Sequence, residues 1–167
     1  MAAVTIRLAR AGDAPLLHHA ILAMAAGMGA QARVTSSPDD LERYGFGDEA
    51  AFEALIAEIG GAFAGMCLYF PSFSTWRGKP GIYIQDIFVE PAFRGRRVGE
   101  RLLKAAASRA HQRGAAYLRL SVDTANLGAQ SFYARLGIEW SQAEHIHGIY
   151  GDAFSALAQC QSSEEER

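Results

Sequence analysis

The stretch that decides the fold is residues 88–100, FVEPAFRGRRVGE. An apolar run over 81–89 leads into it, and Glu90-Pro91 ends that run. The run is apolar on both faces, as a central strand is. After the stretch, apolar residues recur at the spacing of one helix face: Val98, Leu102, Leu103, Ala106 and Ala110. The sequence therefore predicts a central strand, a glycine-containing loop and a long helix in direct succession.

The loop between this strand and helix has the features of an anion site. The first turn of a helix carries unpaired N–H groups and roughly half a positive charge. Glycine lets the backbone approach a ligand closely, and Arg94, Arg96 and Arg97 add full positive charges. This combination suits a pyrophosphate. The alternative is a solvated basic turn before an ordinary helix, and the residues alone do not separate the two.

Upstream of the central strand, the sequence predicts a strand, two helices and a β-hairpin. Asp13 before Pro15 is typical of a helix start. Two apolar runs joined by Gly60-Gly61 are typical of a hairpin. The predicted elements are a strand over 4–10, a helix capped by Asp13 and ended by Gly27 or Gly29, a short helix from Ser36 to Gly45, strands over 52–59 and 62–70, and a loop over 71–80.

Downstream, the pattern predicts alternating strands and helices. These are a strand over 116–122, a helix capped by Asn126 and ended by Gly137, a strand over 146–150 and a helix over 152–159. The element order is β-α-α-β-β-β-α-β-α-β, which predicts a mixed α/β fold. We expect one domain over residues 1–160, followed by a flexible tail over 161–167.

The composition limits the function classes. Half of the 167 residues are apolar and a fifth are charged, which is typical of a soluble globular chain. A net charge of -2 does not fit a nucleic-acid surface. No apolar run approaches the roughly 18 residues of a membrane span, and residues 1–10 alternate as a strand rather than as a signal peptide. Cys67 and Cys160 are too few for a disulfide framework, and no histidines have metal-ligand spacing. We expect a cytoplasmic protein with no metal.

The basic loop resembles the acetyl-CoA pyrophosphate loop of the GNAT superfamily. The pattern of that family is Arg or Gln, two residues, Gly, one residue, then Gly or Ala. Arg94 and Gly99 match it, whereas Arg97 stands where the family has a glycine. The side chain of Arg97 either crowds the phosphate or points outward and strengthens the positive charge.

Other segments extend the resemblance from Ile6 to about Phe154. Asn126, residues 131–133 and residues 136–137 are similar to the second signature of the superfamily. The upstream half resembles one branch, the spermidine/spermine (diamine) and thialysine acetyltransferases. The matching segments are residues 44–47, 57–58, 76–79 and 83–89.

The resemblance implies a fold and a set of binding residues. The fold is a single-domain GNAT fold, a mixed central sheet in which the strand over 82–89 splays from its neighbour over 116–122, flanked by helices. It implies acetyl-CoA as co-substrate and a homodimer. The residues implied to bind acetyl-CoA are Ile87, Phe88, Val89, Arg94, Gly95, Arg96, Arg97, Val98, Gly99, Glu100, Asn126, Ala129 and Tyr133.

The resemblance also implies direct attack of an amine on the thioester, with Tyr133 protonating the departing thiolate. Without the resemblance, Tyr133 reads as a core residue on an apolar helix stripe. In the diamine branch a glutamate removes the proton of the amine, and Gln85 occupies that position here. Asp86 is adjacent, on the opposite face of a regular strand. Asp86 is therefore either a supporting carboxylate or part of the catalytic site, and a water chain is the other route for the proton.

The expected acids of a polyamine site are missing. Ser74, Gln85 and residues 24–29 stand where that branch has carboxylates. We therefore expect a small primary amine of lower charge, such as an amino-acid side chain. Trp76 and Phe73 either form an apolar wall of its pocket or pack within their loop. Two alternatives stay open: an acetyltransferase for protein or peptide lysines or N-termini, and a non-catalytic CoA-binding module.

Overall fold

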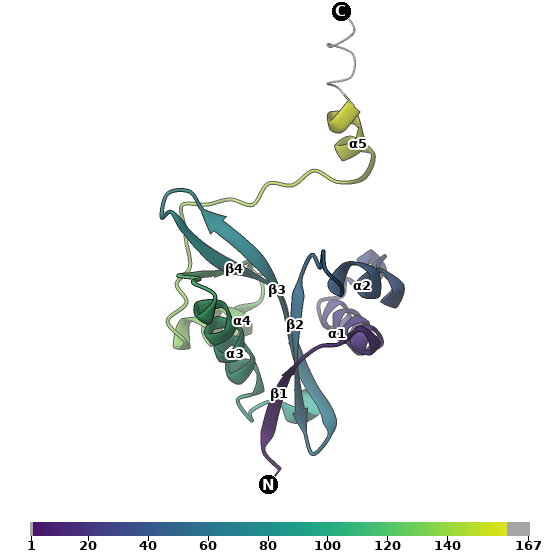
Figure 1. The fold of residues 1–167 in the computed structure, drawn as a ribbon, viewed down its shortest axis with the longest axis vertical. Helices are drawn as coiled ribbons and strands as arrows, with labels where there is room; N and C mark the ends of the chain where they lie inside the picture. Colours follow the sequence, from purple (N-terminus) through teal and green to yellow (C-terminus); the bar gives the residue numbers. More distant parts are fainter. Residues whose placement is uncertain (1, 160–167) are drawn as a thin grey trace, which may run out of the picture. The chain divides into compact units, whose positions relative to one another are not determined.

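A computed structural model describes residues 2–159 of the chain (Figure 1). The chain forms two compact units, one up to Asn126 and the other from Leu127. The predicted tail over 161–167 and Cys160 lie outside the described residues. The domain boundaries expected from the sequence, 1–160 and 161–167, stay a prediction.

The first unit is a five-stranded mixed sheet in the order β1-β2-β3-β4-β5. Neighbouring strands are antiparallel except for β4 and β5, which are parallel. The strands are β1 Val4–Leu8, β2 Glu53–Ile59, β3 Ala62–Ser74, β4 Lys79–Val89 and β5 Leu118–Leu120. The helices are α1 Ala14–Gly27, α2 Pro38–Gly45 and α3 Val98–Gln112, with short 3-10 turns η1 Ala11–Asp13, η2 Gln31–Arg33 and η3 Pro91–Phe93.

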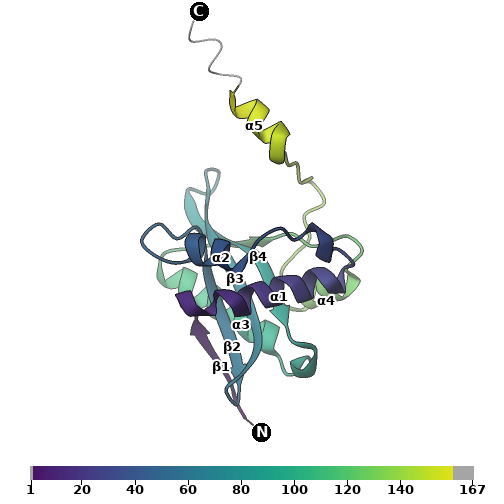
Figure 2. The ribbon, with the colours of Figure 1, turned by 90° about the vertical axis from the view of Figure 1, so that its right-hand side faces the viewer.

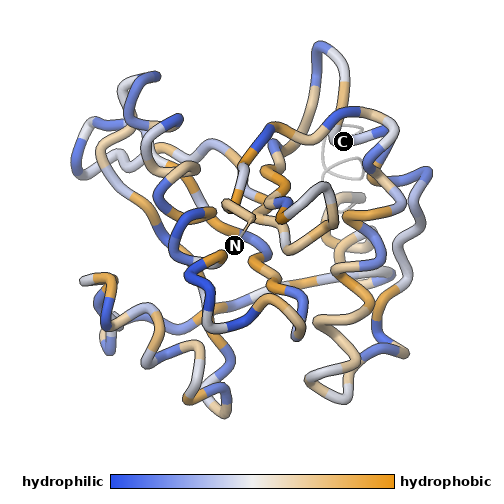
Figure 3. Tube along the Cα trace, turned by 90° about the horizontal axis from the view of Figure 1, so that it is seen from below, coloured by the Kyte–Doolittle hydropathy of each residue, from blue (hydrophilic) through white to orange (hydrophobic). Residues whose placement is uncertain are grey.

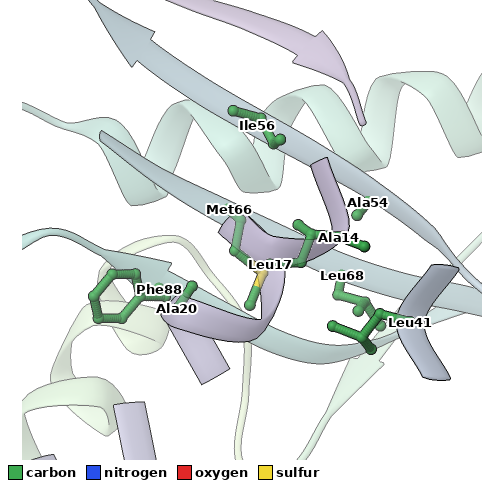
Figure 4. Packing of buried hydrophobic residues seen from close by; sticks show 9 residues of the cluster. All are labelled: Ala14, Leu17, Ala20, Leu41, Ala54, Ile56, Met66, Leu68 and Phe88. Atoms are coloured by element: carbon green, nitrogen blue, oxygen red, sulfur yellow. The ribbon is translucent and has the colours of Figure 1, made fainter. Parts of the chain in front are cut away.

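Helices flank both faces of this sheet, so the predicted mixed α/β class is confirmed. α1 and α2 cover one face and α3 covers the other, and Figure 2 views the sheet from the side of α1. In Figure 3 the helices alternate between hydrophobic and hydrophilic residues, as helices with one buried face do. The core under α1 and α2 consists of Ala14, Leu17, Ala20, Leu41, Ala54, Ile56, Met66, Leu68 and Phe88 (Figure 4).

The ladder between β3 and β4 contains a β-bulge. Leu68 lies opposite Asp86, but the next residue, Tyr69, lies opposite Ile84. Gln85 is therefore the extra residue without a partner on β3. β4 pairs with β5 only over Ile82–Ile84. The bulge thus lies where β4 leaves β5, and the predicted splay between these strands is confirmed.

The hairpin between β3 and β4 is longer than the sequence predicts. Residues 71–80 were expected to form a loop, but β3 continues to Ser74 and β4 begins at Lys79. Pro71 lies inside β3, opposite Ile82. The first residue of β2, Glu53, lies opposite Tyr69, so β3 has no partner on this side beyond Tyr69. Pro71 therefore interrupts no hydrogen bonds to β2. Proline is tolerated at such an edge, and the expected loop is wrong for this reason.

The predicted cap of α1 is also different. Asp13 occupies the N-cap position but makes no side-chain capping bond to the helix. Its carboxylate instead accepts hydrogen bonds from Arg7 Nη1 at 2.7 Å and from the backbone N–H of Arg10 at 2.7 Å. β1 therefore ends at Leu8, two residues earlier than expected, because the chain turns to reach this carboxylate.

The second unit contains α4 Leu127–Arg135 and α5 Gly151–Gln159. Both helices were predicted, with nearly the same bounds. The strand predicted over 146–150 is wrong, because these residues form no strand. A strand needs a partner for its backbone hydrogen bonds, and the described part of the second unit has no other strand to supply one.

Candidate active site

The C-terminal half of β4 has an open edge. Beyond Ile84 the strand continues to Val89, but it pairs only with β3. Ile87, Phe88 and Val89 therefore have a strand partner on one side alone. Extended backbone with free N–H and C=O groups can pair with a ligand that presents amides, as strand addition does. These are the three residues predicted to bind the pantetheine arm.

Gly65 lets β3 approach this half of β4 closely. It lies opposite Val89, and a Cβ atom at this position would be 2.3 Å from the carbonyl oxygen of Phe88. No real Cβ makes such a contact with backbone, so any larger residue must displace the Phe88 peptide. The position of the open edge therefore depends on glycine at residue 65.

The loop after β4 is tied to the end of the strand. Arg94 Nε donates a hydrogen bond to the carbonyl oxygen of Val89 at 3.2 Å. Arg96 donates to the carbonyl oxygen of Ala2 at 3.3 Å and lies over the ring of Phe93. These contacts fix the loop between the open edge of β4 and the start of α3.

Arg97 has a left-handed backbone conformation at the N-cap of α3, with φ 59° and ψ 24°. It is the only non-glycine residue of the described chain with positive φ. This conformation costs an L-residue about 1–2 kcal/mol. Arg97 thus keeps the backbone shape that glycine adopts easily. Its side chain is exposed, and no hydrogen bond to it is present among the described residues.

The start of α3 presents its first N–H groups beside these arginines. The first intrahelical hydrogen bond runs from Arg101 N to Arg97 O at 3.0 Å. The N–H groups of Val98, Gly99 and Glu100 precede it and lack helical partners. Together with Gly95, which has φ 77°, they form the glycine-containing turn that the sequence predicted.

Gln85 and Asp86 lie at the bulge. Gln85 is exposed, and Asp86 is half-buried. Asp86 lies opposite Leu68, a core residue under α1 and α2. Burial raises the pKa of the Asp86 carboxyl from its ordinary 3.8 to about 6. The sequence placed the two side chains on opposite faces by strict alternation, but the bulge breaks that alternation.

Ser74 and Trp76 lie at the other end of the hairpin. Trp76 is 100% exposed, and Ser74 accepts a hydrogen bond from Arg77 N at 3.3 Å. The extended strand from Lys79 to Gln85 is about 20 Å long at roughly 3.3 Å per residue. The structure therefore does not bring these two residues beside Gln85 within one chain.

A partly exposed network of charged side chains near the bulge was not predicted from the sequence. Glu53 accepts hydrogen bonds from Tyr69 Oη at 2.8 Å and from Arg109 Nε at 2.9 Å, and Arg113 adds a third. Burial opposes ionisation of this carboxyl, but the three donors outweigh it and lower its pKa to about 2. Glu53, Tyr69 and the pair Arg109 and Arg113 come from three separate parts of the chain, so no local pattern indicates the network.

Cys67 lies on β3, and His18 and His19 lie on α1. Cys67 is fully buried, and burial together with the charge of Asp86 raises the pKa of its thiol to about 12. The thiol is therefore protonated at neutral pH. His18 bonds to the carbonyl oxygen of Ser36, and His19 contacts Glu90. Within residues 2–159, no three metal-binding side chains gather and no helix is long and apolar enough to cross a membrane.

Two predicted residues belong to the second unit. Tyr133 is the buried residue of α4, and its ring packs on that of Phe132 with centroids 5.2 Å apart. Ala129 lies one turn earlier on the same helix. Asn126 ends the first unit, where its backbone N–H donates to Asp123 O at 2.9 Å.

Comparisons with known proteins agree with this geometry. Residues 21–138 match the model of the Acetyltransferase (GNAT) family. The chain is 34% identical to a thialysine N-epsilon-acetyltransferase of Bos taurus, over 95% of this chain and 99% of that protein. It is 32% identical to an L-ornithine N5-acetyltransferase of Arabidopsis thaliana, over 56% of this chain and 41% of that protein.

Solved structures show the same fold. An integron cassette protein of V. cholerae has a TM-score of 0.77 at 21% identity, covering 93% of this chain and 98% of its own. An aminoglycoside acetyltransferase from a soil metagenome, in complex with sisomicin, has a TM-score of 0.71 at 18% identity, covering 89% and 95%. At these identities the likeness establishes the fold alone.

Proposed function

The chain belongs to the GNAT acetyltransferase family, and we propose that it transfers the acetyl group of acetyl-CoA to the primary amine of a small molecule. The observation that carries this proposal is the open edge of β4 beside the basic start of α3. An extended ligand with amides at one end and a pyrophosphate at the other fits these two features together.

Acetyl-CoA supplies an activated acyl thioester. Backbone groups of Ile87, Phe88 and Val89 bind its pantetheine arm, helped by Asn126 and Ala129. The turn from Arg94 to Glu100 binds the pyrophosphate. The exposed guanidinium of Arg97 supports the outward orientation, in which it adds charge without crowding the phosphate.

The amine attacks the thioester directly. Binding both reactants in line removes much of the barrier, because the reaction no longer depends on a chance encounter. The backbone N–H of Phe88 or Val89 stabilises the negative charge that develops on the carbonyl oxygen. Tyr133 protonates the departing thiolate, a role that suits a phenol with an ordinary pKa of about 10.

The acceptor is a small amine of low charge, similar to an amino-acid side chain. Two relatives are named for the side-chain amines of thialysine and ornithine, which supports this size class. Ser74 and Gln85 replace acids of the polyamine branch, which argues against a multiply charged acceptor. Protein amines are the second candidate.

We also propose a cytoplasmic homodimer, as the resemblance to the diamine branch implies. Phe73 and Trp76, exposed at the hairpin tip, support a contact with a second copy. In that arrangement Ser74 and Trp76 line a pocket without having to reach Gln85 of their own chain.

The test is release of CoA thiol from acetyl-CoA with a panel of amines: thialysine, lysine, ornithine, putrescine, spermidine and a lysine peptide. We expect turnover of an amino-acid amine and about 10²–10⁴-fold less with Tyr133→Phe, at unchanged acetyl-CoA affinity. Tyr150→Phe, at a tyrosine that is 80% exposed, serves as the matched control. Binding of acetyl-CoA without turnover of any amine would favour the non-catalytic module instead.

A further inference from the structure

Asp86 has an unusual position for a carboxylate. It is the first residue of β4 after the bulge and directly precedes Ile87, where the open edge begins. Across the ladder it faces Leu68, and two residues along the strand is Phe88, which packs with Met66 and Ala20 in the core (Figure 4). The carboxylate is therefore next to the proposed thioester site and among apolar neighbours.

No donor within the described residues compensates the charge of Asp86. Among residues 2–159 no hydrogen bond or ion pair holds this carboxylate, and burial alone accounts for its raised pKa. The other carboxyls with shifted pKa values, Asp13, Asp40, Glu53 and Glu100, are each shifted downward by hydrogen-bond donors or cations.

Among residues 2–159, Cys67 is the titratable group whose pKa responds to the charge of Asp86. On β3, Cys67 is a protonated thiol. On α1, which packs against β4, His19 contacts Glu90 at 3.1 Å. On β4 itself, Tyr83 shares a hydrogen bond with Ser121 at 2.5 Å. None of these groups supplies a positive charge to Asp86, so the natural counter-charge is a cation that enters from outside.

We propose that Asp86 is the base that takes the proton from the ammonium group of the acceptor. This inference rests on the proposed acetyltransferase function. Gln85, at the position where the diamine branch has its glutamate, has an amide that does not accept a proton at neutral pH. The bulge at Gln85 places a carboxylate one residue further along, at the start of the open edge.

The steps balance. One proton moves from the ammonium nitrogen to a carboxylate oxygen of Asp86, which leaves a neutral amine with a free electron pair. That pair forms the C–N bond to the acetyl carbon, and the C–S bond breaks with its electrons on sulfur. Tyr133 protonates the sulfur and regains a proton from the nitrogen of the new amide through solvent, and Asp86 releases its proton to solvent. The sum is one amide, one thiol and one proton per turnover.

The proposal also limits the acceptor. A single uncompensated carboxylate matches a single ammonium group at the reacting end of the substrate. Strong interaction between these charges in an apolar setting gives binding as well as deprotonation. We therefore expect the protein to prefer amines with one ammonium near the reacting carbon chain over spermidine, because Ser74 and Gln85 replace the acids that would receive its further charges.

The experiment compares the full-length wild type with Asp86→Asn and with Asp48→Asn, a control at an exposed acid. It measures kcat/KM from pH 5 to 10 for a series of amines of decreasing pKa. We expect kcat/KM of Asp86→Asn to be about 10²–10⁴-fold lower at pH 7. The acidic limb that Asp86 gives the wild type should be replaced by one that follows the pKa of the amine. The activity should therefore recover at high pH and with amines that are neutral at pH 7. Asp48→Asn should match the wild type.

Two further readouts separate the possible outcomes. Calorimetric binding of acetyl-CoA should be equal in the wild type and Asp86→Asn, which shows that the site is intact. If the defect of Asp86→Asn is the same for every amine and at every pH, Asp86 has a structural role and the proposal is wrong. If the variant does not fold, a wild-type profile without an acidic limb near pH 6 also overturns it. Absence of wild-type turnover with all amines would instead contradict the proposed function.

Discussion

β4 is one strand with two different halves. Its first half, Lys79–Ile84, pairs with β3 and, through Ile82–Ile84, also with β5. Its second half, Gln85–Val89, pairs with β3 alone. Pairing on both sides satisfies the backbone and stabilises the sheet. The open half keeps the same extended geometry but leaves polar groups for a ligand, so the first half serves as the scaffold for the second.

The partly buried carboxylates beside the two halves also differ in their hydrogen-bond partners. Beside the paired half, Glu53 receives three donors, one of them Tyr69, which lies opposite Ile84. In the open half, Asp86 receives none among the described residues. A compensated carboxylate stabilises the fold, whereas an uncompensated one destabilises it and is available for chemistry. The difference between these carboxylates coincides with the end of the strand where we propose that the reaction occurs.

The largest expected effect comes from adding one methyl group opposite the open half, at Gly65 of β3. Gly65→Ala places Cβ against the Phe88 backbone, so it must displace the open edge. We expect about 1–3 kcal/mol of overpacking and at least roughly tenfold weaker acetyl-CoA binding. Gly81→Ala is the matched change in the paired half, where Cβ meets the ring of Tyr117, which can move. Calorimetry should find that Gly81→Ala binds acetyl-CoA with normal affinity. Equal losses of affinity in the two variants would contradict the distinction between the two halves of β4.

Removal of the uncompensated carboxylate should stabilise the protein. The pKa of Asp86 is raised in the fold from 3.8 to about 6, so ionisation above pH 6 destabilises the folded state. Asp86→Asn should therefore raise the free energy of unfolding at pH 7 by about 1–3 kcal/mol, and the gain should vanish below pH 3.8. Urea unfolding at several pH values measures this. Lower stability of the variant at pH 7 would mean that the carboxylate has a structural partner.

Removal of the compensated carboxylate should do the reverse. The pKa of Glu53 is lowered from 4.5 to about 2, so its stabilisation is complete above pH 4.5 and is lost as the pH falls towards 2. Because Glu53 is partly exposed, we expect Glu53→Gln to lower the unfolding free energy at pH 7 by about 1–2 kcal/mol. The same urea series should show the two curves converging in acid. Parallel curves would contradict the assigned pKa.

The smallest effect concerns Arg97. Arg97→Gly relieves the left-handed strain and removes one positive charge, so we expect about 1 kcal/mol of added stability together with a several-fold higher KM for acetyl-CoA. Arg97→Lys keeps both the strain and the charge, and should change neither quantity much. If Arg97→Gly binds acetyl-CoA as well as the wild type, the guanidinium does not contact the phosphates.

Local patterns were sufficient for most of the fold. The apolar run over 81–89, the Glu90-Pro91 stop and the helical spacing after Val98 predicted β4 and α3 where they are found. These signals depend only on neighbouring residues. The resemblance then identified the splay between β4 and β5, which the register confirms.

The features that give the site its chemistry were not in local patterns. The bulge at Gln85 arises from the pairing of β3 with β4, and alternation within one strand does not reveal it. The length of the hairpin depends on where the ladder between β2 and β3 stops, at Glu53 and Tyr69. A strand over 146–150 required a partner strand that the described part of its unit lacks. Arginine rarely adopts a left-handed backbone, so the residue type at position 97 does not indicate this conformation. The glycine that the family has at this position is the one indication of it.

The most direct test of the account is residue-resolved amide hydrogen exchange along β4, with and without saturating acetyl-CoA. We expect amides within 85–89 which are not bonded to β3 to exchange at least about tenfold more slowly when acetyl-CoA is bound. Amides within 79–84 should not change, because the sheet already protects them. Saturated binding with no protection in 85–89, or with equal protection in 79–84, would contradict the claim that the open half of β4 holds the ligand.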